Sequence, residues 1–225
     1  MLLVLGIGAL FSGVALLGHV VAGLWLPLTL AVTVGLLVAT VTLIWLRLDR
    51  PQRQILRSMA ARGVVIGLVA TLLYDGSRTL LSQLDSSPYQ PFEVLTVFGR
   101  ALLGGGVSAE AALAAGLAFH FLNGVSFGMA YVFMFGRLAV SSPARALATG
   151  IVWGLFLETF QLTLYPGWLD IAAYREFVTI SFLGHVVYGA TLGLMSRRLL
   201  SGLEMRSTDP ALAGDEYPTA EDDDD

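Results

Sequence analysis

The sequence predicts an all-α integral membrane protein with about six transmembrane helices. The 225-residue chain is 56% hydrophobic and only 13% charged, whereas soluble domains carry roughly 25% charged residues. Mean hydropathy is +0.74. No charged side chain occurs before Arg47, and later apolar stretches are also long enough to cross a bilayer core of about 30 Å. This composition excludes a water-soluble globule, and the absence of Cys excludes a disulfide scaffold.

Residues 1–46 are expected to form a transmembrane hairpin. A single helix of that length would measure about 69 Å, too long for one crossing. Gly23 and Pro27 interrupt the stretch beside Trp25, as in a tight turn at the membrane surface. The two predicted spans are about 2–23 and 27–46. A signal peptide is the rival interpretation of the first span, but a basic start is missing and the apolar run continues past any cleavage point.

Residues 47–62 are expected to form an Arg-rich cytoplasmic loop. All 13 basic residues of the chain are Arg, and cytoplasmic loops carry an excess of positive charge. Placing this loop inside puts ten of the 13 arginines and both termini in the cytoplasm. We therefore expect a multi-pass protein of the plasma (cell inner) membrane.

Residues 63–198 are expected to form a four-helix membrane core. Its predicted spans are about 63–83, 111–135, 144–165 and 177–196. An external loop, 84–109, contains an apolar stretch expected to be an interfacial or re-entrant helix. Ser108 and Ser142 are expected to cap the helices that follow them. Residues 199–225 hold nine acids and are expected to form a disordered acidic tail.

The core contains an internal repeat. The pattern H-x-x-x-G-x-x-x-G begins at His120 and again at His185, and a G-x-x-x-G precedes each copy. We therefore expect two copies of one helical hairpin. Small residues four apart allow close helix packing, so the predicted packing residues are Gly63, Gly67, Gly124, Gly128, Gly150, Gly154, Gly189 and Gly193.

A buried polar site is expected where the repeats place their histidines. Each His shares a helix face with its glycines, and counting along the spans puts two histidines and two carboxylates about 12 Å below the external surface. Ionisable residues at this depth are functional candidates. The predicted site comprises Asp75, Arg78, His120, Asn123, Glu158, Gln161, His185 and Tyr188.

Three interpretations of this site stay open. The side chains can be satisfied structural packing, with Asp75 and Arg78 neutralising each other. They can form a proton- or ion-handling site. They can bind a metal or haem through His120, His185 and Glu158. Enzymatic chemistry has little support, because H-E-x-x-H, phosphate-loop and Cys motifs are missing.

Residues 62–196 resemble the YagU-like and related families of small multi-pass membrane proteins of bacteria and archaea, whose function is unknown. The resemblance rests on His120-x-x-x-Gly124-x-x-x-Gly128 and on the stretch Phe182-Leu-Gly-His185-x-x-Tyr188-Gly189. It implies a helical plasma-membrane protein and assigns no activity, ligand or catalytic residue.

The function predicted from the sequence is a multi-pass membrane protein that handles protons or a small solute through the His/carboxylate pocket. A haem- or metal-binding redox subunit and a structural subunit of a membrane complex are the alternatives. We expect the lipid bilayer as partner, no nucleic acid and no cofactor. A homo-oligomer or a larger complex stays open.

Overall fold

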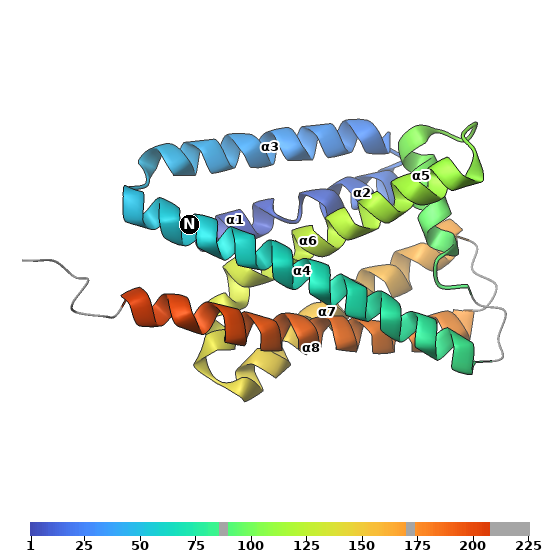
Figure 1. The fold of residues 1–225 in the computed structure, drawn as a ribbon. Helices are drawn as coiled ribbons and strands as arrows, with labels where there is room; N and C mark the ends of the chain where they lie inside the picture. Colours follow the sequence, from blue (N-terminus) through green and yellow to red (C-terminus); the bar gives the residue numbers. More distant parts are fainter. Residues whose placement is uncertain (86–89, 170–173, 208–225) are drawn as a thin grey trace, which may run out of the picture.

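The computed structural model describes residues 1–85, 90–169 and 174–207, and the regular secondary structure of this part of the chain is all helix, without strands (Figure 1). The predicted all-α class is confirmed. Five helices are long and apolar enough to cross a membrane, or six when the bent pair α1–α2 counts as one span. The helices are α1 (Leu2–Gly8), α2 (Phe11–Ala22), α3 (Leu26–Arg47), α4 (Arg50–Leu84), α5 (Glu93–Leu103), α6 (Ala109–Ser141), α7 (Pro143–Leu169) and α8 (Tyr174–Ser207).

The expected first span is bent rather than continuous. Helices α1 and α2 meet at 45° across Ala9 and Leu10. The Ser126 hydroxyl, on α6, donates a hydrogen bond to the Ala9 carbonyl at this break, which satisfies a backbone group that lipid could not. The turn into α3 is as expected: Gly23 has φ +65°, and Pro27 lies in the first turn of α3.

The expected loop 47–62 is wrong, because most of it is helix. Helix α4 begins at Arg50, and Asp49 caps it by accepting from the Gln52 amide nitrogen at 2.8 Å, while the Gln52 side chain accepts from the Asp49 nitrogen. This reciprocal capping box starts a helix immediately after α3. The guanidinium carbons of Arg53 and Arg57 lie 5.5 and 4.7 Å from the Trp45 ring centroid. These two arginines therefore stabilise the turn between α3 and α4. The cytoplasmic location of the segment stays a prediction.

Other helix ends differ less from expectation. The stretch in 84–109 is helix α5, and Ser108 and Ser142 accept hydrogen bonds from the first turns of α6 and α7. Helix α7 continues past its expected end at residue 165, and α8 continues past its expected end at 196. The first residues of the expected disordered tail, 199–207, are thus helical, and 208–225 lie outside the described residues.

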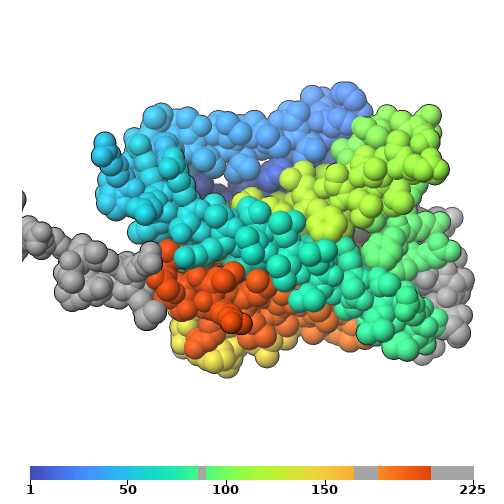
Figure 2. Space-filling view, viewed as in Figure 1, coloured from blue at the N-terminus to red at the C-terminus, as the bar shows by residue number. Residues whose placement is uncertain are grey.

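Helices α4 and α6 pack as one antiparallel pair and α7 and α8 as another. Helix α4 packs on α8 and joins the two pairs, and these two helices lie side by side on the face shown in Figure 2. Helix α3 lies at the edge, and Leu26 is its one buried residue. The core that holds the polar residues is therefore built from α4, α6, α7 and α8, with α1 and α2 packed against α6.

Both pairs pack through glycine. A Cβ on Gly67 would lie 2.6 Å from the Gly124 carbonyl oxygen, and one on Gly128 would clash with the Gly67 backbone. In the second pair, a Cβ on Gly150 would clash with the Gly189 carbonyl and one on Gly193 with the Ala146 carbonyl. Backbones this close leave no room for a methyl group. The remaining predicted packing glycines lie at the same two interfaces: Gly63 against Met129 and Gly154 against the His185 carbonyl.

Replacing one of these glycines by Ala should therefore destabilise the protein. We expect Gly128→Ala to lower the free energy of unfolding by about 1–3 kcal/mol through overpacking. The matched control is Gly35→Ala on α3, where no atom lies within 4 Å of the added Cβ; because Ala is the better helix former, this variant should be neutral or slightly more stable. Denaturation in detergent micelles measures both, and equal stability of the two variants would contradict glycine packing.

Candidate functional site

The first part of the site is a pair between α4 and α6. His120 Nε2 lies 3.0 Å from Asp75 Oδ1 and 3.1 Å from Oδ2. Both side chains keep 15% of their surface exposed. The ion-pair partner of Asp75 is therefore His120 on the neighbouring helix, and not Arg78 on the same helix as the packing interpretation expected.

The second part is a pair between α7 and α8 that is almost fully buried. His185 Nδ1 lies 2.6 Å from Glu158 Oε2, and Glu158 is 1% exposed. The Ser181 hydroxyl donates to the same carboxylate oxygen at 2.8 Å. A buried carboxylate is costly unless it is paired and hydrogen-bonded. One imidazole and one hydroxyl are partners of Oε2, whereas Oε1 is buried without a hydrogen-bond partner among the described residues.

The surroundings of His185 indicate its tautomer. Its Nδ1 faces two acceptors, Glu158 Oε2 at 2.6 Å and the Ser181 carbonyl at 3.0 Å. Nδ1 must therefore carry a hydrogen. Its Nε2 lies 3.1 Å from the Gln161 amide nitrogen, which is a donor, so Nε2 of the neutral ring is an acceptor. One nitrogen is thus directed at the carboxylate and the other at Gln161.

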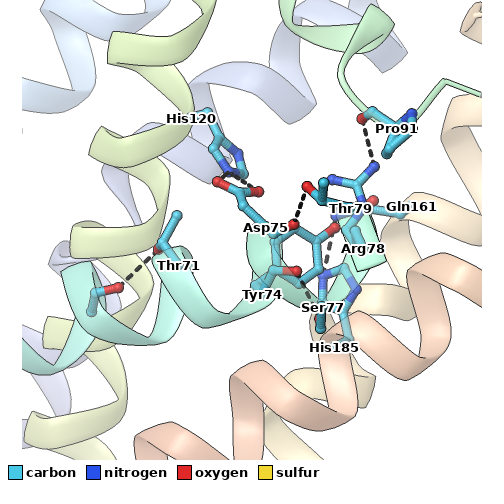
Figure 3. Close-up of polar contacts among 11 residues, drawn as sticks. Thr71, Tyr74, Asp75, Ser77, Arg78, Thr79, Pro91, His120, Gln161 and His185 are labelled. Carbon is cyan, nitrogen blue, oxygen red and sulfur yellow. Dashed lines mark hydrogen bonds and ion pairs between the residues drawn. The ribbon is translucent and has the colours of Figure 1, made fainter. Parts of the chain in front are cut away.

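Tyr74 contacts the histidines of both pairs, His120 and His185 (Figure 3). Its ring centroid is 6.1 Å from that of His120 and 4.8 Å from that of His185. The distance between the two imidazole centroids therefore cannot exceed the sum of these two distances. Gly184 provides the space, because a Cβ there would lie 2.9 Å from Tyr74 Cε2. The shared site expected from the repeat thus exists as two pairs on either side of one aromatic ring.

The other expected site residues surround these pairs. An Arg78 nitrogen donates to the Pro91 carbonyl at 2.7 Å, and the guanidinium lies 4.8 Å from the Tyr74 ring centroid. The Tyr188 hydroxyl donates to the Gly124 carbonyl at 3.1 Å, which ties α8 to α6. Asn123 is buried, and its Oδ1 has no hydrogen-bond partner among the described residues. Arg78 and Tyr188 therefore position backbone and rings, while the His–carboxylate pairs hold the titratable groups.

The two His–carboxylate pairs differ in where the acid lies on its helix: relative to the packing glycines, the two positions are one helical turn apart. Asp75 lies twelve residues after Gly63, whereas Glu158 lies eight after Gly150. The packing of the two hairpins is offset by a similar amount. In the first hairpin Gly128 packs on Gly63 and Gly67, whereas in the second Gly193 packs on Ala146, four residues before Gly150. The position of the acid and the packing of the helices are thus offset together, so each hairpin places one acid beside its histidine.

All four titratable side chains lie near one end of the bundle. At 1.5 Å per residue, Asp75 is about 14 Å from the end of α4, and His120, Glu158 and His185 are each about 17 Å from the nearer ends of their helices. These depths fall inside a hydrocarbon core of about 30 Å if the ends of the helices lie near its surface.

Two residues of the site, Tyr74 and Ser181, were missed from the sequence. The residues suggested as metal ligands do not come together around one point. Tyr74 precedes Asp75 in the chain, and Ser181 lies one turn before His185, so helical spacing could have indicated both. Within the described ranges, His, Asp and Glu side chains do not gather in groups of three that could hold a metal ion. His120 and Glu158 belong to different pairs.

No protein-family model matches the chain, and neither does any curated protein or solved structure. The resemblance to the YagU-like families therefore stays a prediction.

The difference in burial between the pairs predicts different coupling energies. In a double-mutant cycle, Glu158→Gln with His185→Gln should give a coupling free energy of about 1.5–3 kcal/mol, because removing one partner leaves the other buried and unmatched. Asp75→Asn with His120→Gln should give about 1 kcal/mol or less, because solvent or headgroups reach that pair. Unfolding in detergent measures both cycles, and a larger coupling for the partly exposed Asp75–His120 pair would contradict the assignment.

Proposed function

We propose that this multi-pass membrane protein passes protons through the two His–carboxylate pairs to the nearer end of its helical bundle. The observation that carries the proposal is Glu158, a carboxyl group 1% exposed within helices long enough to cross a membrane. Ionisable groups at such positions are costly and commonly mark ion or proton pathways. Two such pairs in one four-helix core favour transfer over a single structural contact.

The geometry of His185 suits proton transfer. One ring nitrogen contacts Glu158, and the other is the unprotonated acceptor of the neutral ring, which takes up a proton when it leaves the Gln161 amide, because an amide does not itself relay protons. An imidazole can take up a proton at one nitrogen and release one from the other, and it does so near neutral pH. Glu158 would then act as the buried proton acceptor and His185 as the group that connects it to the rest of the site.

The Asp75–His120 pair provides the second station. Both of its side chains are partly exposed, so this pair can exchange protons with the surroundings. Tyr74 contacts both imidazoles, and the path between the pairs passes its ring. The charged groups that face this path from the packed helices are Asp75 and Arg78 on α4, His120 on α6, Glu158 on α7 and His185 on α8.

Proton flux in proteoliposomes tests the proposal. With an imposed pH gradient, the wild type should carry flux above that of empty liposomes, and both Glu158→Gln and His185→Gln should reduce it at least about tenfold while the protein stays folded. Glu93→Gln is the matched control, because it makes the same chemical change at an exposed residue in the first turn of α5. Its flux should equal that of the wild type.

Two results would overturn the proposal. Wild-type liposomes without flux, combined with variants that are merely less stable, would leave the pairs as structural packing. Unchanged flux in both variants would remove Glu158 and His185 from any pathway. A Soret band or bound metal in the purified protein would instead favour the haem- or metal-binding alternative.

A further inference from the structure

A cavity of about 160 Å³ lies between α2 and α7, and His185 forms part of its wall. Its lining is largely apolar, with Val14 and Leu17 from α2 and Phe156 and Phe160 from α7. Leu10, at the bend between α1 and α2, also lines it. Mostly apolar concavities with one or two convergent polar groups are the usual form of small-molecule sites.

The size and lining of this cavity suit one six-membered ring. An apolar protein cavity of roughly 150 Å³ is known to hold benzene, and this cavity has about the same volume. Phe127 from α6 joins the two α7 phenylalanines in its wall. Aromatic side chains pack favourably on a ring through offset and edge-to-face contacts. The cavity therefore has room and suitable walls for a single aromatic ring.

The polar part of the wall has hydrogen-bonding capacity that a hydroxyl on such a ring would match. The Gln161 amide lines the cavity beside His185. One of its N–H groups donates to His185 Nε2 at 3.1 Å, and its Oε1 lies 3.4 Å from the Ser181 hydroxyl, whose one hydrogen is directed at Glu158. An amide has a second N–H donor and further acceptor capacity. A hydroxyl both donates and accepts, so it matches this amide, whereas an ether offers only an acceptor.

The mouth of the cavity opens onto the outer surface of the bundle. Val14 is 52% exposed, Phe156 47% and Phe160 40%, and all three lie on predicted membrane spans. In a bilayer this surface faces lipid, so an apolar tail attached to the ring can extend into the acyl chains without crossing protein.

We propose that the α2–α7 cavity binds a lipid-soluble phenol, that is, a hydroxylated aromatic ring with an apolar tail, whose hydroxyl bonds to Gln161 next to the buried His185–Glu158 pair. Hydroquinones with prenyl tails belong to this chemical class. The site shares His185 with the proposed proton pathway, but the inference rests on the shape and lining of the cavity. Binding is measured without a pH gradient, so its failure and a failure of proton flux are distinguishable.

Radiolabelled 4-nonylphenol and its methyl ether, 4-nonylanisole, test the site on the full chain in lipid nanodiscs, with empty nanodiscs as blank. The phenol should bind saturably at one per protein, and the ether at least about tenfold more weakly, because it leaves the amide acceptor unmatched. Gln161→Leu should reduce this preference below about threefold while ether binding persists.

Val14→Phe fills the mouth and should abolish saturable binding of both probes. Its matched control, Val32→Phe, adds the same side chain at an exposed position of α3 and should bind as the wild type does. Equal affinity for phenol and ether would overturn the proposal and indicate a cavity filled by ordinary acyl chains. Wild-type affinity in a folded Val14→Phe protein would also overturn it, because the phenol would then bind elsewhere.

Discussion

The close approach of glycine backbones between paired helices is the constraint on which the rest of this structure depends. In lipid there is little hydrophobic force to hold helices together, so association relies on packing and interhelical hydrogen bonds. Gly67 against Gly124, and Gly150 against Gly189, bring the backbones together where any Cβ would collide. Each histidine lies one turn from such a glycine on the same helix face, so the glycine contact also directs the imidazole toward the partner helix.

The polar core is a consequence of that approach. Once His120 and His185 face their partner helices, a carboxylate at the matching level satisfies each of them, and the buried Glu158 gains a second donor from Ser181. Tyr74 then fills the space between the pairs, which Gly184 leaves open. The α2–α7 cavity reaches the same His185 from the outer surface of the bundle. One imidazole therefore contacts a buried acid, an aromatic ring and an apolar cavity.

Much of this arrangement could be predicted from the sequence, because glycine spacing and hydropathy act locally. The six apolar stretches, the turn at Gly23 and the caps at Ser108 and Ser142 follow from such local signals. The start of α4 was also readable, since Asp49 and Gln52 have capping-box spacing, but the arginine-rich composition suggested a loop. Gly6 and Gly8 weaken the helix before the bend at Ala9, but they do not fix its place, because the hydrogen-bond partner Ser126 lies far along the chain.

The division of the site into two pairs could not be predicted. Depth counting placed the four titratable groups at one level but gave no register between helices. The one-turn slide that sets Gly193 on Ala146 decides that His185 meets Glu158 and that His120 meets Asp75. Such a slide depends on side chains along the whole of each interface, such as Met129 and Thr71 between α4 and α6, and no single motif specifies it.

A dipolar-coupling measurement by solid-state NMR tests the central claim most directly. The chain has only three histidines, so a sample with ¹⁵N-labelled histidine and ¹³C-labelled glutamate in bilayers gives few signals. The account predicts a strong coupling between His185 Nδ1 and the Glu158 carboxyl carbon. It also predicts that this coupling weakens in Gly154→Ala, where the new Cβ would collide with the His185 carbonyl. A folded wild-type protein without the coupling, or a Gly154→Ala protein that keeps it undiminished, would contradict the claim that glycine packing assembles the site.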